Sequence, residues 1–303
     1  MIALLLAIVT ALFFPGIIVR VKSIVSGRKG PGIFQSWKNI FVLLRKSSVF
    51  STTTSYIFQI APVIYLATLV CAILLLPFPG MPSGFGFGAD FVLLAYLLAL
   101  GKFFFIIGAL DTGSSFEGMG ANREALYSML AEPAFFILFG TLALLTGHLS
   151  MQSIFEQFHL SGYNSLISGM IAVYVLIQIA MIENSRMPVD DPKTHLELTM
   201  IHEVMILDHS GFDLALIQIG TNLKFALYGI LIANILIPVT WALPYRIALF
   251  FGIQAAFAAS IGLMESFRAR KKMMKNPQFI VTLSSIALVG FILSLLMMYQ
   301  LIR

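Results

Sequence analysis

The polar stretch Glu183-Asn-Ser-Arg-Met-Pro-Val-Asp-Asp-Pro-Lys-Thr-His-Leu-Glu-Leu-Thr-Met-Ile-His-Glu203 interrupts a chain that is otherwise strongly apolar. Seven of the fourteen Asp and Glu residues fall between Glu183 and Asp213. Asp191 suits the N-cap of a short helix, and Pro192 suits its first position because that position needs no backbone N–H. We therefore predict a short helix here, within a connector that joins two apolar runs.

The second half of this stretch, residues 196–207, mixes Glu197, His202 and Glu203 with Leu, Met, Ile and Val. A helix of that composition lies against an apolar surface while its carboxylates stay near water or polar partners. A charged loop between membrane spans is the alternative interpretation.

Composition places the chain among polytopic membrane proteins, since 59% of its residues are hydrophobic and 11% are charged. Its length suits one integral membrane domain, residues 1–303, without a separate soluble domain. The single cysteine, Cys71, cannot form an internal disulfide or supply a cysteine-ligated iron–sulfur or structural zinc site. The formal net charge of +5 is a signal for membrane orientation, and nucleic acid is not an expected partner.

Apolar runs predict an all-α fold of about eight transmembrane helices, because each run is long enough to cross a hydrocarbon core of about 30 Å. The runs are residues 2–19, 57–76, 91–110, 125–145, 166–182, 214–237, 247–264 and 279–302. Residues 33–44 place aromatic and aliphatic side chains at helical spacing beside Lys38. This pattern predicts a short amphipathic helix that lies in the membrane interface.

Basic residues orient the predicted bundle. Fifteen of the nineteen Lys and Arg residues fall in the loops after the first, third, fifth and seventh spans. Loops with such an excess face the cytoplasm, so both termini are expected outside and residues 183–211 inside. The expected location is the cell inner (cytoplasmic) membrane, which the chain crosses several times.

One carboxylate, Glu132, falls inside a predicted span, roughly 10 Å from its start at about 1.5 Å per residue. Charged groups at such depth are unfavourable and usually face a bundle interior or a water path. Pro133 frees a backbone carbonyl one turn earlier and can kink the helix. Two compatible interpretations follow: a functional carboxylate that exchanges protons, and a structural carboxylate paired with Lys102 or Lys224.

The histidines of the polar stretch do not form a metal-binding pattern. His195 and His202 lie seven residues apart, roughly 10 Å along a helix, which is too far for one ion. His202-Glu203 is not followed by the second histidine of a metalloprotease motif, because Ile206 stands there. We expect no metal site and no catalytic centre within this chain.

Several motifs carry a resemblance that covers nearly the whole chain. Glu183-x-x-Arg-x-Pro-x-Asp190, with Glu197 further on, resembles subunit 1 of respiratory complex I. The run from Asp190 to Glu203 is similar to the membrane subunit of group 4 nickel–iron hydrogenases, the family of hydrogenase-4 component C and formate hydrogenlyase subunit 4. Two further segments resemble the same family: 118–134, where Gly-Met-Gly-Ala-Asn-Arg-Glu leads to Ala-Glu-Pro-Ala, and 27–46, which opens on Gly-Arg-Lys-Gly-Pro.

The resemblance implies a membrane subunit that anchors a cytoplasmic hydrogenase arm and couples its electron transfer to proton or sodium movement. The nickel–iron centre and the [4Fe-4S] clusters would lie on partner subunits, and this chain would bind no cofactor. The expected partners are the hydrogenase large and small subunits, an iron–sulfur subunit, antiporter-like membrane subunits and the lipid bilayer.

The resemblance also implies roles for charged residues, since acids in a low dielectric respond to nearby changes in charge. The predicted proton relay consists of Glu132, Glu183, Asp190, Asp191, Glu197 and Glu203. Supporting charge is expected from Lys102, Arg123, Arg186, His195, His202 and Lys224. Partner docking is expected at Arg28, Lys29, Gln35 and Glu117, on a surface built from residues 20–55, 111–124 and 183–211.

One departure from the complex I pattern bears on the function. Complex I subunit 1 usually adds two carboxylates before the position of Glu197, whereas this chain has Lys193 and His195. The missing carboxylates argue against a quinone-reactive, complex I-like NADH dehydrogenase subunit 1, which stays as the alternative function. An independent ion transporter is a third hypothesis, which the lack of an inverted pair of broken spans in the sequence disfavours.

Overall fold

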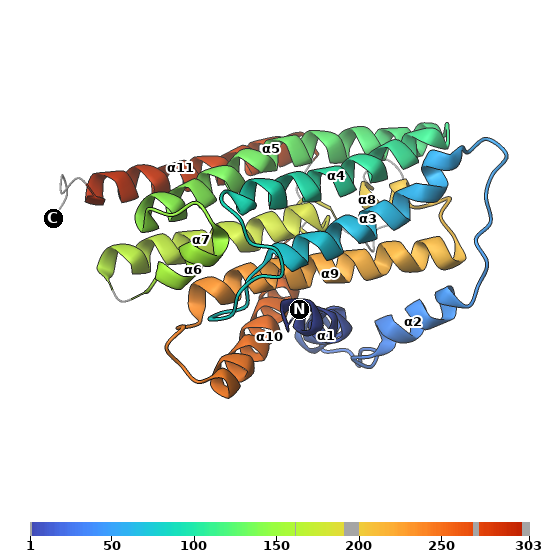
Figure 1. Cartoon of the computed structure of the whole chain (residues 1–303). Helices are drawn as coiled ribbons and strands as arrows, with labels where there is room; N and C mark the ends of the chain where they lie inside the picture. Colours follow the sequence, from blue (N-terminus) through green and yellow to red (C-terminus); the bar gives the residue numbers. More distant parts are fainter. Residues whose placement is uncertain (1, 161, 191–199, 269–272, 299–303) are drawn as a thin grey trace.

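The computed structural model describes residues 2–160, 162–190, 200–268 and 273–298, and within them the chain is built from helices. Eight helices are long and apolar enough to cross a membrane, which confirms the predicted all-α polytopic fold (Figure 1). They are α1 (Ile2–Val25), α3 (Tyr56–Leu75), α4 (Asp90–Asp111), α5 (Ser115–Thr146), α7 (Tyr163–Glu183), α9 (Gly211–Leu236), α10 (Leu243–Phe267) and α11 (Asn276–Met298). The short elements are α2 (Gln35–Leu44), α6 (Met151–Gln157), α8 (His202–Met205) and the 3₁₀ turn η1 (Met273–Lys275).

Helix α9 forms the centre of the bundle (Figure 1). It packs against α1, α2, α3, α7 and α10, and 19 of its 26 residues are buried. Gly229 allows α10 to approach, because a Cβ there would lie 2.1 Å from Gln254 Oε1. A helix covered on all sides must satisfy its polar groups inside the protein. Accordingly, Lys224 donates to Glu183 of α7, and Asn234 donates to the carbonyl of Pro77.

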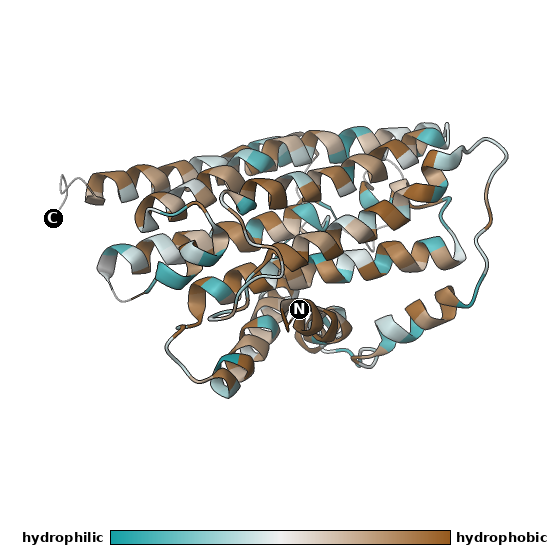
Figure 2. Cartoon of the chain, viewed as in Figure 1, coloured by the Kyte–Doolittle hydropathy of each residue, from teal (hydrophilic) through white to brown (hydrophobic). Residues whose placement is uncertain are grey.

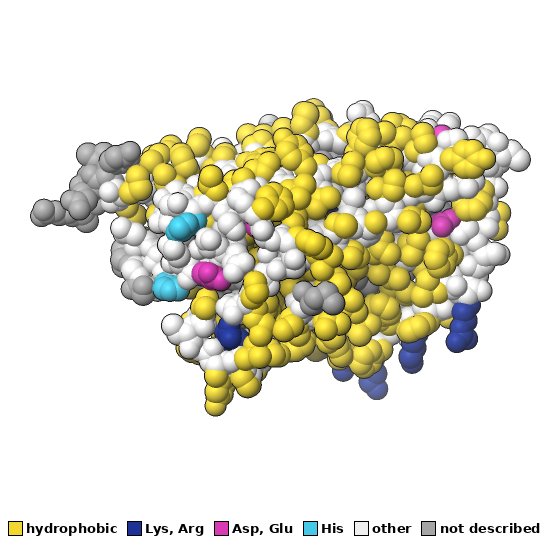
Figure 3. Space-filling model, in the orientation of Figure 1, with side chains coloured by type: hydrophobic (Ala, Val, Ile, Leu, Met, Phe, Trp, Pro, Cys, Tyr) yellow, Lys and Arg dark blue, Asp and Glu magenta, His cyan; other side chains and the backbone are white. Residues whose placement is uncertain are grey.

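Helices α1 and α10 pack together and cross the rest of the bundle. In Figure 1 α1 is seen nearly end-on, whereas α4, α5 and α9 run across the view. Figure 2 shows that the long helices are apolar over most of their length, with hydrophilic residues in patches and in the connections. In Figure 3 hydrophobic side chains cover most of the visible face, and most visible Lys and Arg side chains gather below α2. This distribution fits a bundle surrounded by lipid with its basic residues at one end.

Helix α5 begins at Ser115, ten residues before the predicted start at residue 125. The glycine-rich segment 111–124, which lies between two predicted spans, is therefore mostly helical. Gly120 in this segment allows close packing, since a Cβ there would lie 2.8 Å from the backbone oxygen of Ile201, whereas Gly113 has a positive φ and lies in the turn before α5.

Helix α6 lies between the fourth and fifth predicted spans, where the sequence pattern predicts no helix. Asp90, the first residue of α4, holds it in place, because Asp90 Oδ1 accepts a hydrogen bond from the N–H of Met151 at 2.6 Å. A carboxylate from another helix thus satisfies a free N–H at the start of α6. This contact depends on the packing of α4 and could not be foreseen from local spacing.

Helix α2 matches the amphipathic helix predicted at residues 33–44. Ile40 is buried, whereas Phe41 and Val42 are exposed. Trp37 Nε1 donates to the carbonyl of Ala11 in α1 at 3.3 Å, which ties α2 to the bundle. The helix predicted to start at Asp191 lies outside the described residues, and the described part of that stretch contains the short helix α8.

We expect Gly211→Ala to lower the melting temperature of the purified protein more than Gly113→Ala. Both glycines have a positive φ, +52° and +71°, where an alanine costs about 1–2 kcal/mol. A Cβ at Gly211 would also lie 2.3 Å from the backbone oxygen of Ser47, whereas a Cβ at Gly113 would meet no atom within 4 Å. Equal shifts in melting temperature would contradict the close packing of α9 on the segment at Ser47.

Candidate functional site

Four charged side chains from four helices form a continuous chain inside the bundle. Lys102 Nζ of α4 lies 2.9 Å from Glu124 Oε1 of α5 and 3.0 Å from Glu183 Oε2 of α7. Lys224 Nζ of α9 lies 2.8 Å from the same oxygen of Glu183. We call this set, in the order Glu124–Lys102–Glu183–Lys224, the ionic chain. Its two positive charges balance its two negative charges.

The ionic chain is buried, because none of its side chains is more than 10% exposed. Burial of a charge carries a penalty of several kcal/mol per ion, which only pairing and hydrogen bonding offset. Removal of one member leaves a buried charge unpaired and is expected to destabilise the fold by roughly 3–5 kcal/mol. The loss of any one of the four residues is therefore expected to destabilise the other three.

The turn after α7 fixes the position of Glu183, the last residue of that helix. Lys224 Nζ donates to the Glu183 backbone carbonyl at 2.8 Å, so the cation also satisfies the helix end, where carbonyls lack partners. Two residues later, Ser185 Oγ donates to Glu124 Oε2 at 3.3 Å. The same turn thus contacts both ends of the ionic chain.

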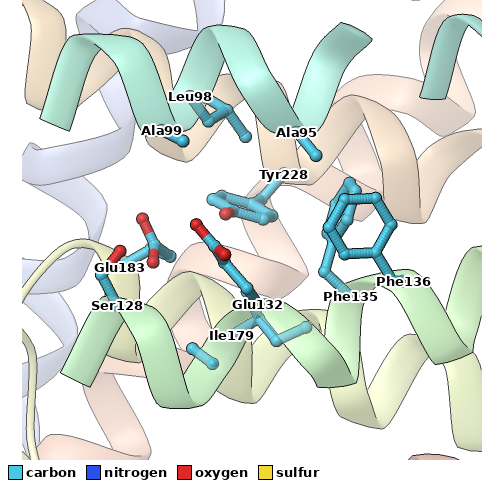
Figure 4. A pocket seen from close by; sticks show the side chains of 11 residues that line it. Ala95, Leu98, Ala99, Ser128, Glu132, Phe135, Phe136, Ile179, Glu183 and Tyr228 are labelled. Atoms are coloured by element: carbon cyan, nitrogen blue, oxygen red, sulfur yellow. The ribbon is translucent and has the colours of Figure 1, made fainter. Parts of the chain in front are cut away.

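A cavity of about 30 Å³ adjoins Glu183 (Figure 4) and opens to the surface of the chain beside Glu132, whose side chain is exposed. Its polar lining comes from Ser128, Glu132, Glu183 and Tyr228, and its other walls are apolar. In Figure 4 the side chains of Glu132, Glu183 and Tyr228 converge on the same space. A cavity needs roughly 10–15 Å³ to hold one water molecule, so this one has room for a water between the two carboxylates.

Both lysines considered as partners of Glu132 are engaged by other carboxylates. Lys102 pairs with Glu124 and Glu183, and Lys224 pairs with Glu183. Glu124 and Glu132 are eight residues apart on α5, roughly 12 Å along its axis, and the described ion pair of Lys102 on this helix is with Glu124. Glu124 is the member of the ionic chain that sequence reasoning missed, because segment 111–124 was expected to lie outside the helices.

A second ionic cluster lies on the α1 and α10 side of α9. Glu265 Oε2 of α10 lies 2.7 Å from Lys22 Nζ of α1, and Glu265 Oε1 lies 3.4 Å from Arg186 Nη1. The guanidinium of Arg186 also lies over the ring of Phe225, 5.2 Å from its centroid. Arg186 was predicted to supply countercharge, and its described carboxylate partner is Glu265.

The described part of the polar stretch is held by Asp190 and by α5. Asp190 Oδ2 accepts hydrogen bonds from the N–H groups of Ile201 at 3.2 Å and His202 at 3.1 Å, at the start of α8. Arg123 Nη1 of α5 donates to the carbonyl of Met200 at 3.2 Å. These two charged residues, predicted as a relay member and a supporting charge, therefore also fix the connector on the bundle.

Several of the predicted residues lie elsewhere. Glu203 is half-buried on α8. The predicted relay residues Asp191 and Glu197 and the predicted supporting residue His195 lie outside the described residues. Among the residues that are described, no three His, Cys, Asp or Glu side chains gather as a metal ion would require.

Three segments meet at the end of the bundle that carries the basic loops. The N–H of Val49 donates to Ser210 Oγ at 2.9 Å, which joins the first loop to the connector. Ser55 Oγ donates to Asp111 Oδ1 at 2.8 Å, which joins the same loop to the end of α4. We call the described residues of segments 20–55, 111–124 and 184–211 the basic face.

The predicted docking residues differ in exposure. Arg28, Lys29 and Gln35 are exposed on the basic face. Glu117 is only 1% exposed, and its Oε1 accepts a hydrogen bond from the N–H of Asp208 at 3.2 Å. The early start of α5 places Glu117 inside the chain, so it supports the fold and is not available to a partner.

Two histidines near the basic face stack on aromatic rings. The His209 ring lies 4.0 Å from Phe58 and the His202 ring 5.3 Å from Phe105, measured between centroids. Desolvation lowers the pKa of each histidine to about 4. His202, predicted as a supporting charge, is therefore neutral at pH 7.

Known proteins match both the sequence and the fold. The sequence profile of the NADH dehydrogenase family matches residues 1–297. Hydrogenase-4 component C of Escherichia coli (strain K12) is 31% identical over 236 residues, which cover 78% of this chain and 73% of that protein. Formate hydrogenlyase subunit 4 of the same organism is 28% identical over 197 residues, which cover 65% of this chain and 63% of that protein.

Two more distant matches extend the comparison. NADH-ubiquinone oxidoreductase chain 1 of Cyanidium caldarium is 24% identical over 230 residues, which cover 74% of this chain and 65% of that protein. A chain of the membrane-bound sulfane sulfur reductase, an archaeal respiratory membrane complex, superposes with a TM-score of 0.81 over 96% of both chains. The identity to that chain is 18%, so this match bears on the fold alone.

We expect Lys102→Met to destabilise the protein by roughly 3–5 kcal/mol, because it leaves Glu124 without its lysine and weakens the pairing of Glu183. Glu124→Gln removes the stranded charge, so the double variant Lys102→Met/Glu124→Gln should recover part of the loss. Melting temperatures of the single and double variants give the coupling directly. Strictly additive losses would contradict the ionic chain.

Burial of His209 should make stability fall as the pH drops from 6.5 toward 4. An unfolded histidine titrates near pH 6.5, whereas the folded one stays neutral until about pH 4. The unfolded state therefore binds more protons in this window, which costs roughly 1–2 kcal/mol between pH 6.5 and 5. His209→Phe keeps the ring stack and removes the titration, so its melting temperature should fall less with acid than that of the wild type.

The exposed His159 supplies the matched control for this measurement. His159→Phe should follow the wild-type melting temperature at every pH. A gap between His209→Phe and the wild type that stays constant from pH 7 to pH 5 would show that His209 is not held neutral.

Proposed function

The chain belongs to the NADH dehydrogenase family, which also includes complex I-like membrane subunits of hydrogenases, and from this premise we propose that it couples a cytoplasmic hydrogenase arm to ion movement. In this proposal the chain anchors a group 4 nickel–iron hydrogenase or hydrogenlyase arm to the membrane. Electron transfer in the arm drives proton or sodium translocation through the chain. The nickel–iron centre and the [4Fe-4S] clusters belong to partner subunits.

The observation that carries the proposal is the ionic chain joined to Glu132 through the small cavity. Apolar residues of similar size would pack these helices as well or better, because a buried ion pair adds little net stability. Ionisable groups at such depth usually belong to an ion or proton path. Four paired charges and a further carboxylate within the spans therefore support a transport role.

Glu183 is the residue through which the path responds to the arm. It bonds to both lysines and lines the cavity with Glu132. The chain after Glu183 leads within three residues to Arg186, whose partner Glu265 belongs to the second ionic cluster. A change of charge or position in the connector alters the field at Glu183, and interacting groups of this kind change protonation together.

Proton transfer then runs between carboxylates. A proton that reaches Glu183 weakens its two ion pairs, and a water in the cavity passes the proton on to Glu132. The displaced positive charge of Lys102 stays close to Glu124, which accepts from it at 2.9 Å. Each step moves one proton between oxygen atoms and leaves the helices in place.

The basic face is the proposed docking surface for the iron–sulfur subunits of the arm. Hydrogen bonds join its three segments into one surface, and Arg28, Lys29 and Gln35 are exposed on it. Basic side chains attract acidic surfaces and orient a partner during association.

We expect Glu132→Gln to reduce ion translocation by the complex in sealed vesicles at least tenfold. Glutamine keeps the size and hydrogen bonding of the side chain but carries no transferable proton. Hydrogenase turnover with an artificial dye and the subunit composition should stay at the wild-type level. Glu156→Gln, at an exposed position on α6, is the matched control and should pump normally.

Three outcomes would contradict the proposal. Wild-type ion stoichiometry in Glu132→Gln would remove this residue from the path. A lower melting temperature with normal transport in the surviving complexes would make Glu132 structural. Purification of a tagged chain without nickel but with quinone reductase activity would replace the hydrogenase function with the quinone-reactive alternative.

A further inference from the structure

One carboxylate in the middle of a membrane span lies at the surface of the chain. Glu132 is exposed on α5, at the mouth of the cavity that Glu183 and Tyr228 line (Figure 4). It lies 17 residues after Ser115 and 14 before Thr146, the ends of α5, or roughly 25 and 21 Å along the helix. Glu132 is therefore near the middle of a hydrocarbon core of about 30 Å.

Glu132 takes part in none of the ion pairs among the described residues. The lysines at mid-depth in the described spans, Lys102 and Lys224, are buried and pair with Glu124 and Glu183. The ionic chain is neutral by itself, so Glu132 adds one negative charge that no described side chain balances. A charge that faces hydrocarbon is strongly unfavourable, and such groups usually meet a protein partner or a water path.

Small residues flank Glu132 where α4 and α5 meet. Ala95 and Ala99 of α4, four residues apart, and Ser128 of α5 line the cavity and are half-buried. In Figure 4 the two alanines lie on α4, across the cavity from Ser128 and Glu132 on α5. Small residues at this spacing let a second transmembrane helix approach closely, and polar side chains then bond across the interface. A long side chain from such a helix has room to reach the carboxylate.

The depth of Glu132 limits what can balance its charge. Lipid headgroups lie at the interfaces, roughly 15 Å from the middle of the core. A water in the small cavity can carry a proton, but it adds no counter-charge. A basic side chain on a second transmembrane helix supplies both the charge and a hydrogen bond at this depth. Lysine suits a proton path better than arginine, because an ammonium group can release its proton and a guanidinium cannot.

We propose that the α4–α5 face, the exposed residues of segments 93–103 and 126–136, docks a transmembrane helix of another membrane subunit that places a lysine against Glu132. The ammonium balances the charge of Glu132 and donates hydrogen bonds to its oxygens. The inference rests on the proposed function and extends its path by one group. A proton on the Glu132 carboxyl passes to the neutral amine, which leaves a carboxylate beside an ammonium.

A second copy of this chain does not supply the partner. Apart from Glu132, the exposed residues of the α4–α5 face are aliphatic side chains, aromatic side chains, a methionine and a proline. The lysines at mid-depth in the described spans, Lys102 and Lys224, are buried inside the bundle. A symmetric pairing through this face would therefore bring two carboxylates together, which disfavours the ionised form of both.

The first test places a photo-crosslinking amino acid at Met129 of the full chain in its membrane complex. Met129 is 63% exposed and lies one turn before Glu132 on α5. The matched control is Ile8, exposed on α1. We expect residue 129 to crosslink to a transmembrane segment of a different subunit, with a lysine within one turn of the crosslinked site. Residue 8 should not crosslink to that segment.

The second test measures recovery of the crosslinked subunit with the purified complex. Glu132→Leu removes the acceptor, so recovery should fall about fivefold, the order expected from one lost interhelical hydrogen bond. Glu132→Gln should keep wild-type recovery, because the amide still accepts a hydrogen bond and the lysine becomes neutral. Glu156→Leu, at an exposed position on α6, is the matched control and should cause no loss.

The third test exchanges the charges. Glu132→Lys should lower recovery at least tenfold, because two like charges then meet within the membrane. Replacement of the partner's lysine by glutamate in the same complex should restore recovery to within twofold of the wild type. A variant that merely unfolds this chain would not be restored by a change in another subunit.

Four results would overturn the inference. They are crosslinks from residue 129 to lipid alone, crosslinks to a second copy of this chain, a crosslinked segment without a lysine within one turn, or wild-type recovery of the partner with Glu132→Leu. Nickel content and ion translocation, measured in the wild-type complex, report on the proposed function. Retention of both with a lipid-only crosslink rejects the docking face alone. A lysine-bearing crosslink in a complex that translocates no ions rejects the coupling role and leaves the docking face standing.

Discussion

The shared carboxylate of Glu183 is the interaction on which the bundle interior depends. One of its oxygens lies within 3.0 Å of Lys102 and within 2.8 Å of Lys224, which come from helices on different sides of α7. Because a buried lysine needs a counter-charge, a shift of α9 would leave Lys224 without its carboxylate, and a shift of α4 would separate Lys102 from Glu183. Glu124 supplies the second negative charge, which balances the two lysines. The positions of the four helices therefore depend on one another through these charges.

The two ionic clusters lie on different sides of the central helix and are joined by one short piece of chain. Glu183 belongs to the ionic chain, and Arg186 reaches Glu265, which also binds Lys22. The intervening turn includes Ser185, which donates to Glu124. Ion pairs of α4 and of α10 are thus connected through the three peptide units between Glu183 and Arg186.

The sequence predicts the spans well because a bilayer imposes one length on every helix that crosses it. It predicts the ends of helices less well, and α5 shows the reason. Ser115 to Glu124 has a polar, glycine-rich composition typical of a loop, but its neighbours α8 and Met200 cover it and supply partners. Because the start of α5 was predicted too late, Glu124 was not recognised as part of the ionic chain, and Glu117 was predicted at the surface although it is buried.

The sequence predicts which charged residues lie in the candidate site, but it does not predict which of them form ion pairs. Hydropathy alone marks Glu132, Glu183, Lys102 and Lys224 as charges within or beside spans. Which lysine meets which carboxylate depends on the tilt and rotation of each helix, and tertiary packing decides both. The hydrogen bonds of Asp190 could not be predicted for the same reason, because its partners Ile201 and His202 lie eleven and twelve residues further along the chain.

The segment between Lys46 and Ser55 is held near both of its ends by contacts with other helices. Ser47 lies against Gly211, Val49 bonds to Ser210, and Ser55 bonds to Asp111. Its span is therefore set by contacts at the start of α9 and at the end of α4. Insertions and deletions, which surface loops ordinarily absorb, would here pull α2 or α3 out of register. The loop sets the spacing between α2 and the membrane span α3, and its length is part of the architecture.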